Sequence, residues 1–288
     1  MQPHPASGPP LRPDIALLVS TYQKPNHLRN CLESITFQHG VAGRFEVVVT
    51  DDGSEDETAQ IVRDFARCAP FPVRFTTHPH KTFQLARCRN EGVLASAAPY
   101  LLFLDGDCLL PPNHVAEHLR ARRPGVVMAG DCFRLDEATS ARISPDVIRS
   151  GEYTAWIPSS ERRRLARRHR RAIWYNMIRH PSKPRLVGNN VAVWRCDYQR
   201  VNGYDEQFEG WGCEDDDLGM RLRRLGIRVR SILGRTSPIH LWHPPDVTAP
   251  RSWREGSNVK YLLQKDRPIR CLDGLYKFTE EQEHVRVA

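Results

Sequence analysis

The sequence has no long apolar segment and no pattern of paired cysteines. Its longest apolar runs, such as 15–19 and 100–104, have the length of strands, whereas a membrane-spanning helix needs roughly 20 residues. Its eight cysteines are scattered without a CxxC pair, so the sequence indicates neither a zinc module nor a disulfide framework. We therefore expect reduced thiols in a soluble, cytoplasmic protein that touches at most the inner face of a membrane peripherally.

A glycine-rich phosphate loop and a secretory signal are also missing. The first apolar run ends in Ser20-Thr21-Tyr22-Gln23-Lys24-Pro25, which contains no glycine. A sugar-phosphate nucleotidyltransferase would need such a loop, and this alternative is therefore disfavoured. Residues 1–13 are rich in proline and lack the basic-then-apolar layout of a signal peptide, so we expect a disordered lead-in there.

Positive charge is in excess and comes largely from arginine. Lysine and arginine number 42 against 34 acidic residues, a net charge of +8. The densest cluster lies in 161–171 and holds Arg162, Arg163, Arg164, Arg167, Arg168, Arg170 and Arg171. Such a run could bind an anionic membrane surface, an acidic glycan or nucleic acid, or simply form a solvated helix or a mobile loop. No aromatic residue is interleaved before Trp174, which disfavours nucleic acid and a non-catalytic role in binding it.

Strand-length apolar runs alternate with helix-like segments over the first 130 residues. This alternation is typical of βαβ units that build a largely parallel sheet. The predicted strands are 15–20, 45–50, 73–76, 100–104 and 126–129. The predicted helices are 25–37, 57–67, 83–97 and 112–122. Ser54-x-x-Glu57 fits a capping box, which would fix the start of the second helix.

The second half of the chain is less regular. Over 136–183 the pattern fades into charged sequence punctuated by proline, which we interpret as a variable Arg-rich insertion or a mobile connection. Order resumes with a strand at 186–194, a glycine-rich turn, a helix at about 215–225 and a strand at 228–233. A chain of this length can bury a full core. We expect one catalytic domain over 14–250, with a nucleotide-binding half at 14–131, an acceptor and catalytic half at 186–250, and a tail at 251–288.

Two pairs of acids directly follow predicted strands. Residues 45–50 run into Asp51-Asp52-Gly53-Ser54, and residues 101–104 run into Asp105-Gly106-Asp107. In open α/β sheets, ligands bind beyond the carboxyl ends of the strands. Carboxylates placed there can accept hydrogen bonds from a nucleotide or hold Mg²⁺ or Mn²⁺ bound through a diphosphate. A simple turn at Asp52-Gly53 and a chance DxD are the alternatives when either motif is taken alone.

Four successive acids stand at the start of a predicted helix. Gly210-Trp211-Gly212-Cys213 leads into Glu214, Asp215, Asp216 and Asp217. The helix dipole favours one or two acids at this position, but four exceed what it explains. Successive helical side chains point about 100° apart, so the four cannot share one task. Trp211 offers a flat apolar wall for a sugar, or else a core contact.

Two histidines follow the last predicted strand. Both imidazoles of His240-Leu241-Trp242-His243 could complete a metal site begun by Asp107, although a stray surface pair is the alternative. Mixed imidazole and carboxylate ligation favours Mn²⁺ over Mg²⁺, because Mg²⁺ prefers oxygen ligands and keeps its waters.

From Ile15 to His243, the order and spacing of the motifs resemble the inverting nucleotide-sugar glycosyltransferases of the GT-A fold, particularly family 2. The resembling segments are Val19-Ser20-Thr21-Tyr22, Asp51-Asp52-Gly53-Ser54, Ala86-Arg87-Cys88-Arg89-Asn90-Glu91-Gly92, Asp105-Gly106-Asp107, Gly188-Asn189-Asn190 and Asn202-Gly203-Tyr204-Asp205. Residues 210–217, with His240 and His243, are similar to β-1,4-galactosyltransferases and chondroitin-type polymerases, in which a second glycine usually stands in place of Cys213. The first loop departs from the common pattern at Ser20, where proline is frequent.

The resemblance implies an α/β, Rossmann-like GT-A fold with a mostly parallel central sheet flanked by helices. It implies a metal-dependent, inverting hexosyl- or N-acetylhexosaminyl-transferase that moves a sugar from a nucleotide-sugar, UDP-sugar above all, to a glycan or lipid-linked acceptor. Asp215 would be the catalytic base and Glu214 would orient a sugar. Asp107, His243 and His240 would hold Mn²⁺ or Mg²⁺. The implied donor residues are Thr21, Tyr22, Asp52, Phe83, Arg89, Asp105 and Trp211, and the implied acceptor residues are Asn189, Asn190 and Trp211.

Overall fold

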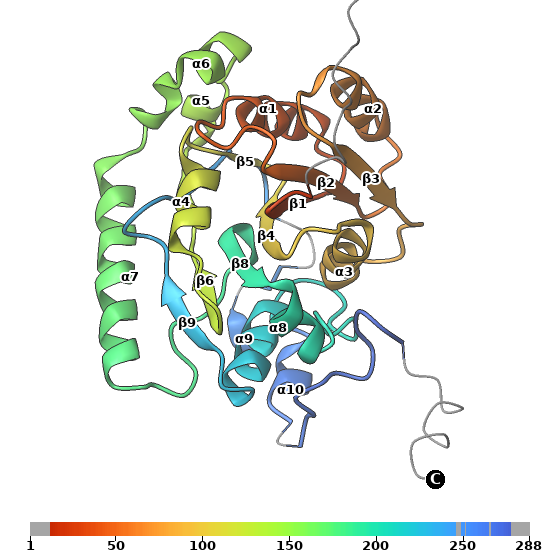
Figure 1. Ribbon diagram of the computed structural model, residues 1–288, viewed down its shortest axis with the longest axis vertical. Coiled ribbons are helices and arrows are strands. Elements are labelled where there is room, and N and C mark those ends of the chain that lie inside the picture. The colour runs from red at the N-terminus through yellow and green to blue at the C-terminus, as the bar shows by residue number, and fades with distance from the viewer. Residues whose placement is uncertain (1–11, 246–248, 251, 265, 278–288) are drawn as a thin grey trace, which may run out of the picture.

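Strands and helices alternate through the first part of the chain, as Figure 1 shows. The computed structural model describes residues 12–245, 249–250, 252–264 and 266–277. The elements up to residue 129 are β1 (Ile15–Thr21), α1 (Pro25–Thr36), β2 (Phe45–Asp51), α2 (Thr58–Cys68), β3 (Val73–Thr77), α3 (Leu85–Ala95), β4 (Tyr100–Asp105), β5 (Cys108–Leu109), α4 (His114–Ala121) and β6 (Val126–Ala129). The predicted strands and helices of this part are confirmed to within a few residues at their ends.

Helices dominate the middle of the chain, and short elements follow. The elements from residue 133 onward are β7 (Phe133–Arg134), α5 (Glu137–Ser140), α6 (Pro145–Ser150), η1 (Glu152–Thr154), α7 (Ser159–Met177), η2 (Gly188–Asn190), β8 (Val191–Trp194), α8 (Arg195–Arg200), α9 (Glu214–Arg224), β9 (Arg228–Ser231), β10 (Ile239–His240), η3 (Trp253–Glu255) and α10 (Val259–Leu262). Among the described residues, no helix has both the length and the apolar character needed to cross a bilayer.

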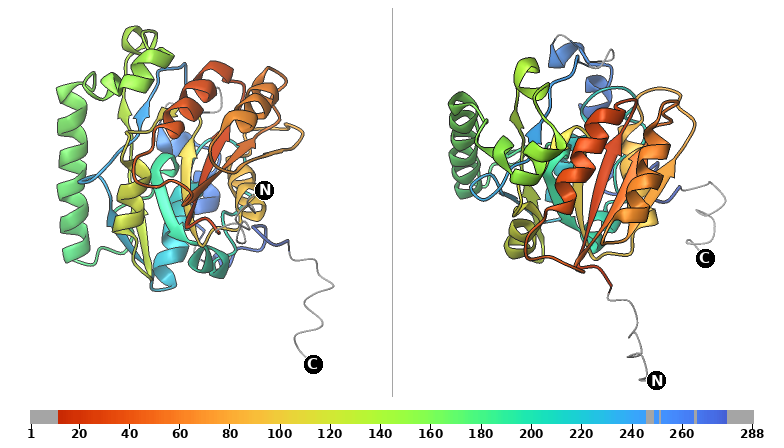
Figure 2. Two further views of the ribbon diagram at one scale, coloured as in Figure 1. Left: turned by 45° about the horizontal axis from the view of Figure 1, so that its top comes forward. Right: turned by 90° about the horizontal axis from the view of Figure 1, so that it is seen from above.

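A seven-stranded sheet in the order β3-β2-β1-β4-β8-β6-β9 forms the centre of the molecule. Its pairs are parallel except where β8 runs between β4 and β6 in the opposite direction. Helices cover both faces of this sheet (Figure 2), so its central strands β1, β2 and β4 are buried on both sides, as their largely apolar sequences indicate. The mostly parallel α/β fold is confirmed. A second sheet in the order β5-β10-β7 lies beyond the end of β4.

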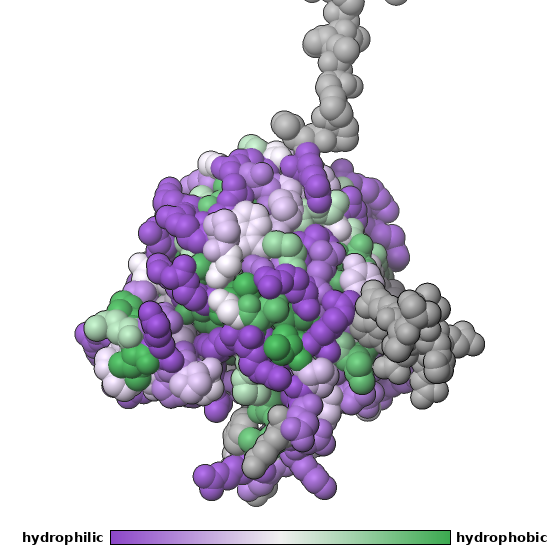
Figure 3. All heavy atoms as spheres, turned by 60° about the horizontal axis from the view of Figure 1, so that its bottom comes forward, coloured by the Kyte–Doolittle hydropathy of each residue, from purple (hydrophilic) through white to green (hydrophobic). Residues whose placement is uncertain are grey.

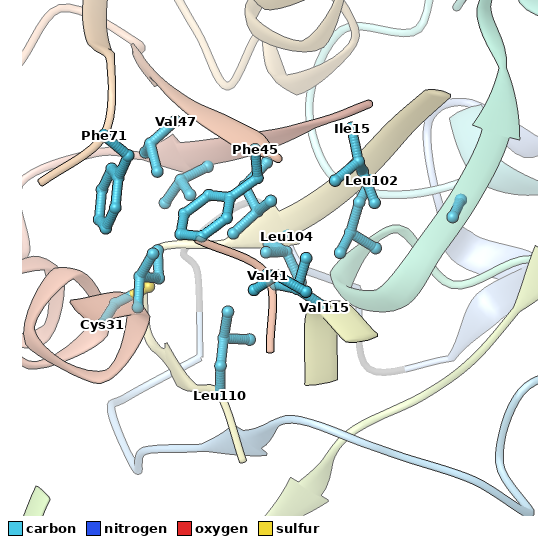
Figure 4. Packing of buried hydrophobic residues seen from close by; sticks show 14 of the residues in the cluster. Ile15, Cys31, Val41, Phe45, Val47, Phe71, Leu102, Leu104, Leu110 and Val115 are labelled. Atoms are coloured by element: carbon cyan, nitrogen blue, oxygen red, sulfur yellow. The ribbon is translucent and has the colours of Figure 1, made fainter. Parts of the chain in front are cut away.

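The core consists of two apolar layers, because alternate residues of each strand point to opposite faces. Leu17, Val47 and Leu102 belong to the layer that also contains α1 and part of α2, which Figure 4 shows from close by. Leu18 and Phe103, one position along β1 and β4, face the other layer, where α3, α8 and α9 pack. The sheet is thereby held rigidly, which fixes the positions of its strand ends.

The segment 136–183 is not a mobile connection, because it folds into α5, α6, η1 and the 19-residue helix α7. Only Leu165 and Ala172 of α7 are buried, so the helix gives little hydrophobic periodicity. On the inward face of α7, polar contacts take the place of most apolar ones. Arg164 and Arg168 donate to Asp131 at 2.9 and 2.7 Å, and this carboxylate is itself 1% exposed.

Two smaller predictions also need correction. The strand predicted at 186–194 begins only at Val191, after the short helix η2. Ser54 does not form a capping box with Glu57; its hydroxyl donates to Asp51 at 2.5 Å, and α2 begins at Thr58 without a side-chain cap. The Asp51 carboxylate competes successfully for the serine because it lies on the adjoining turn.

The described part of the predicted tail packs onto the domain. Arg267 donates to Asp205 at 2.9 Å and pairs with Asp217 at 2.8 Å, and Cys271 and Leu275 are buried. These contacts place 252–264 and 266–277 against the segment that precedes α9. Most of the predicted lead-in and residues 278–288 lie outside the described residues.

Candidate active site

The acidic motifs meet at the carboxyl ends of β1, β2 and β4. Ser20 pairs with Asp105 and Thr21 with Asp51 in the parallel register of the sheet. Gly106 donates its N–H to the Ser20 carbonyl at 2.8 Å, and a Cβ at Gly106 would lie only 3.1 Å from that oxygen. A glycine between the two acids therefore lets their turn press against the loop that follows β1.

Asp107, His240 and His243 form a group with metal-ligand chemistry. One ligand atom from each lies within 4.8 Å of the others. His243 Nε2 is 3.0 Å from Asp107 Oδ2, and His240 Nε2 is 3.5 Å from Asp107 Oδ1. The chain brings them together through strand pairing, because β10 pairs with β5 and Leu241 donates to the Asp107 carbonyl at 2.9 Å. The pair is therefore not on a helical turn, and both imidazoles still reach the carboxylate.

The ammonium group of a lysine side chain lies on one side of this group. Lys24 Nζ lies 3.1 Å from Asp107 Oδ2 and 2.9 Å from His243 Nε2. Burial opposes ionisation of Asp107, but the hydrogen bond from His243 and the charges of His240 and Lys24 hold the pKa of its carboxyl below the ordinary value. The carboxylate and imidazole donors thus fit a divalent cation, and the lysine ammonium shows that positive charge is stabilised there.

Arg89 links the DxD motif to the acidic run. Its guanidinium is 1% exposed; Nη1 donates to Asp215 Oδ1 at 2.9 Å, and Nη2 lies 3.5 Å from Asp105 Oδ1. Its Nη1 also lies 3.4 Å from Glu214 Oε1. A Cβ at Gly188 would lie 1.9 Å from Arg89 Nη2, so only glycine leaves room for the guanidinium. The structure therefore places Arg89 as a buried contact between three carboxyl groups.

Glu214 and Asp215 stand in contrasting environments. Asp215 accepts hydrogen bonds from Arg89, from the Tyr204 hydroxyl at 2.9 Å and from the Gly188 N–H at 2.7 Å. These three hydrogen bonds fix the orientation of the Asp215 side chain. Glu214 has one long contact, and its burial, together with the charge of Asp215, raises its pKa to about 8. Burial likewise raises the pKa of Asp105 to about 6.

The other two acids of the run bind arginines. Asp217 accepts from Arg221 Nε at 2.8 Å, and Asp216 lies 3.3 Å from Arg185 Nε. These arginine contacts agree with the expectation that the four acids do not share one task. Cys213, which precedes the run, has a φ of +78°. Glycine tolerates this backbone conformation best, which explains its presence at this position in the resembling families.

Asp52 and Tyr22 lie together with two histidines that no motif indicated. His78 Nε2 donates to Asp52 Oδ1 at 2.9 Å and His78 Nδ1 to Glu91 at 2.9 Å, and these two bonds raise the pKa of His78 to about 9. The His80 ring stacks on Tyr22 with 4.2 Å between centroids. A positively charged imidazole thus holds the Asp52 carboxylate beside an aromatic stack.

The remaining predicted site residues differ in how exposed their side chains are. Phe83 is half-buried and its carbonyl accepts the Gly210 N–H at 2.9 Å, which brings the turn carrying the 44% exposed Trp211 next to α3. Asn189 is mostly buried, with Nδ2 donating to Cys132 Sγ at 3.2 Å. Asn190 is fully buried and contacts His118 and the Asp131 carbonyl, so its side chain has no surface to offer an acceptor.

Sequence reasoning missed four side chains of this site. Lys24 and Tyr204 lie inside segments that were singled out, the loop after β1 and Asn202-Gly203-Tyr204-Asp205, so their motif context was available. His78 and His80 follow β3, and only its pairing with β2 brings them to Asp52. No local pattern could have indicated them.

Similarity to known proteins agrees with this geometry. The chain matches the family model "Glycosyl transferase family 2" over residues 16–189 and "N-terminal domain of galactosyltransferase" over residues 168–243. It is 28% identical over 257 residues to validoxylamine A glucosyltransferase of Streptomyces hygroscopicus subsp. jinggangensis, covering 82% of this chain and 58% of the relative. It is 24% identical over 268 residues to chondroitin synthase of Escherichia coli, covering 88% of this chain and 38% of that protein.

Solved structures with the same fold include two sugar-nucleotide complexes. The mannosyltransferase PcManGT from Pyrobaculum calidifontis, in complex with GDP-Man and Mn²⁺, has a TM-score of 0.56 and 18% identity, covering 83% of this chain and 60% of that one. S. aureus TarS 1-349 in complex with UDP-GlcNAc has a TM-score of 0.54 and 16% identity, covering 81% and 60%. Because the family 2 model matches more than half of the chain, this protein belongs to the family 2 glycosyltransferases of the GT-A fold.

Proposed function

We propose that the protein transfers a sugar, with inversion, from a nucleotide-sugar to a hydroxyl of a glycan or lipid-linked acceptor. The observation that carries this proposal is the contact of buried Arg89 with Asp105 on one side and with Asp215 and Glu214 on the other. Through this contact, the DxD turn and the acidic run share one edge of the sheet. A diphosphate-binding group and a candidate base are thereby brought into a single site.

The nucleotide is assigned to the ends of β1, β2 and β4. We infer that Asp52, Asp105 and Thr21 accept or donate hydrogen bonds to the base and ribose, and that the Tyr22 ring, with Phe83 nearby, packs against the nucleotide. Arg89 positions Asp105 rather than contacting the donor itself, since its guanidinium is buried among carboxyl groups. A UDP-sugar is the proposed donor, by analogy with the UDP-GlcNAc complex of TarS. The alternative donor is a GDP-sugar, by analogy with the GDP-Man complex of the mannosyltransferase.

Asp107, His240 and His243 are the proposed ligands of Mn²⁺, with Mg²⁺ as the weaker alternative for a site containing two imidazoles. The ion, when bound, supplies Lewis-acid neutralisation of the diphosphate leaving group. Lys24 adds a second positive charge at the same place and can turn toward the diphosphate, because its side chain is 34% exposed. The leaving group would then meet positive charge from both the protein and the ion.

Asp215 is the proposed base and Glu214 the proposed sugar-orienting group. A base has to be positioned to reach the acceptor hydroxyl, and hydrogen bonds from Arg89, the Tyr204 hydroxyl and the Gly188 N–H fix the position of the Asp215 carboxyl group. Glu214, whose pKa is raised to about 8, carries a proton at neutral pH and can donate a hydrogen bond to a sugar hydroxyl. The two neighbouring carboxyl groups therefore stand in different environments, which suits them to different roles. Trp211 would form the wall of the sugar site, with Asn189 on the acceptor side.

A donor-hydrolysis screen tests the activity and the donor together. The protein is incubated with UDP-, GDP- and dTDP-sugars, with Mn²⁺ or with EDTA, and the released nucleotide is measured. We expect turnover of a UDP-sugar that EDTA abolishes and Mn²⁺ restores. Asp215→Asn serves as the matched inactive control, because it keeps the size of the side chain. Activity that survives chelation would refute the metal site, and turnover of no donor would refute the proposed reaction.

The proposed setting is the cytoplasm, at the inner face of the membrane. The scattered cysteines suit a reducing compartment. The excess of arginine suits contact with an anionic surface, which is also where lipid-linked acceptors are presented.

A further inference from the structure

Helix α7 is fixed to the domain along one side only, as Figures 1 and 2 show at the edge of the molecule. Its inward face consists of the buried Leu165 and Ala172, of Arg164 and Arg168 bound to Asp131, and of His169, whose ring lies 3.0 Å from the Ser231 hydroxyl. These contacts run for about half the helix and set its rotation. The identity of the outward-facing residues is therefore determined.

The outward face carries one continuous stripe. Arg163, Arg167, Arg170, Trp174 and Met177 follow one another at intervals of four and three, which places them on a single side of an α-helix. All five are exposed, Trp174 by 54% and Met177 by 75%. We call these five residues the outer stripe.

Apolar surface gathers at the C-terminal end of this stripe. Ile173 and Ile178 are 47% and 49% exposed and flank Trp174 and Met177. Figure 3 shows apolar residues on the side of the molecule where this end of α7 lies. Exposed apolar side chains scattered singly need no explanation, but four at one helix end, next to a row of arginines, mark an interaction surface.

The helix carries almost no negative charge. Glu161 is its one acidic residue, and that carboxylate is already bound by Arg164 at 2.8 Å on the inner side. Arg162 and Arg171 are exposed beside the outer stripe and add to its charge. The outward face of α7 is thus positive along its length and apolar at its end.

We propose that the outer stripe of α7 binds the surface of an anionic lipid bilayer. The helix lies along the surface, with its arginines on lipid phosphates and with Trp174, Met177 and the two isoleucines in the headgroup and upper acyl region. Basic side chains bind anionic headgroups and apolar ones enter the interface, where tryptophan is favoured. In α7 the two kinds succeed one another along the outer stripe, so its C-terminal end is the part that enters the bilayer. The inference is independent of the proposed transfer reaction, because it uses no residue of the candidate active site.

Other partners fit this surface less well. A second copy of the chain would bring two rows of arginines together without acids on the same face to pair with them. Nucleic acid or an acidic glycan would match the arginines but leave Ile173, Met177 and Ile178 without an apolar partner. Of the partners compared, only a bilayer supplies negative charge and an apolar phase at one surface.

Vesicle co-sedimentation of the full chain tests the proposal. We expect binding to vesicles of phosphatidylcholine mixed with phosphatidylglycerol, weaker binding at high salt, and little binding to phosphatidylcholine alone. Arg163→Gln with Arg167→Gln should lower the partition coefficient roughly thirtyfold, at about fivefold per arginine. The matched control is Arg63→Gln with Arg67→Gln, which removes the same charges at the same spacing from exposed positions of α2.

A second pair of variants tests the apolar end. Trp174→Ser with Met177→Ser should lower binding by roughly tenfold or more, whereas Leu94→Ser, which removes a 56% exposed leucine from α3, should leave it unchanged. Donor hydrolysis should be unaffected in all these variants. The proposal is overturned if stripe variants bind anionic vesicles like the wild type. It is also overturned if the protein binds heparin or RNA but not vesicles. A protein that is dimeric in solution, and that the Trp174→Ser substitution makes monomeric, would overturn it as well.

Discussion

Replacement of Glu214 by glutamine should make the protein more stable above neutral pH. The Glu214 side chain is buried, and its cationic contact within the described part of the chain, Arg89 at 3.4 Å, is shared with Asp215 at 2.9 Å. Burial and the neighbouring Asp215 charge therefore disfavour ionisation and raise its pKa from 4.5 to about 8. Glutamine has nearly the same shape and hydrogen-bonding capacity as the protonated acid, but it never acquires the charge.

The sign of the pH dependence follows from this shift. Below pH 4.5, Glu214 is protonated in the folded and the unfolded chain, and its burial has little electrostatic cost. Between pH 4.5 and 8 the unfolded chain loses the proton while the folded chain retains it, so folding becomes less favourable as the pH rises. Each pH unit in this window costs up to about 1.4 kcal/mol. The stability gap between Glu214→Gln and the wild type should thus grow by about 3 kcal/mol between pH 5 and 7.5.

Urea denaturation of both proteins at several pH values measures this gap. The free energy of unfolding is compared at each pH, so titration of other groups cancels to first order. Glu55→Gln is the matched control, because Glu55 is exposed and its substitution should change little at any pH. A difference between Glu214→Gln and the wild type that stays constant with pH would refute the assignment of a protonated, buried Glu214.

Three further perturbations address the site. Asp215→Asn should lower transfer by about 10²- to 10⁴-fold while donor binding persists, and near-normal turnover of this variant would contradict the role of Asp215 as base. Glu214→Gln should retain much more activity than Glu214→Ala. Lys24→Met should tighten Mn²⁺ binding in calorimetry about two- to fivefold, since a competing ammonium at a partly exposed carboxylate is removed; weaker binding would show that Lys24 supports the ion. Gly188→Ala should cost about 1 to 3 kcal/mol in thermal unfolding, because its Cβ would enter the space of the Arg89 guanidinium. An unchanged melting temperature would show that the guanidinium can move aside freely.

The sequence predicted those elements whose packing is apolar. β1, β2 and β4 are continuous apolar runs, and the helices between them carry enough buried aliphatic residues to show their period. Helix α7 was only one of the alternatives that the sequence left open, because Arg164 and Arg168 reach Asp131, over 30 positions earlier in the chain, in place of apolar contacts. Such a pairing has no local signature, since each partner alone looks like a surface charge.

The part of the site that could be predicted from the sequence is the part formed by residues at the ends of parallel strands. Asp52, Asp105 and Asp107 follow strands, and a parallel sheet brings such positions to one edge whatever the details of packing. The contacts of Lys24, His78 and Tyr204 depend instead on loop conformation and strand order, which one sequence does not specify. This is why the candidate metal-binding group Asp107, His240 and His243 was predicted without the lysine that contacts it.

The run Glu214–Asp217 shows how four successive carboxyl groups are accommodated in one helix turn. Asp217 is almost fully buried between Arg221 at 2.7 Å and Arg267 at 2.8 Å, so loss of either arginine would leave a buried charge that is only partly compensated. This pairing ties the start of α9 to α9 itself and to the segment after 250. With Asp216 and Asp217 paired to arginines, Glu214 and Asp215 are held facing Arg89. The residues after 250 therefore act on the proposed base from a distance, by fixing the helix turn from which Asp215 projects.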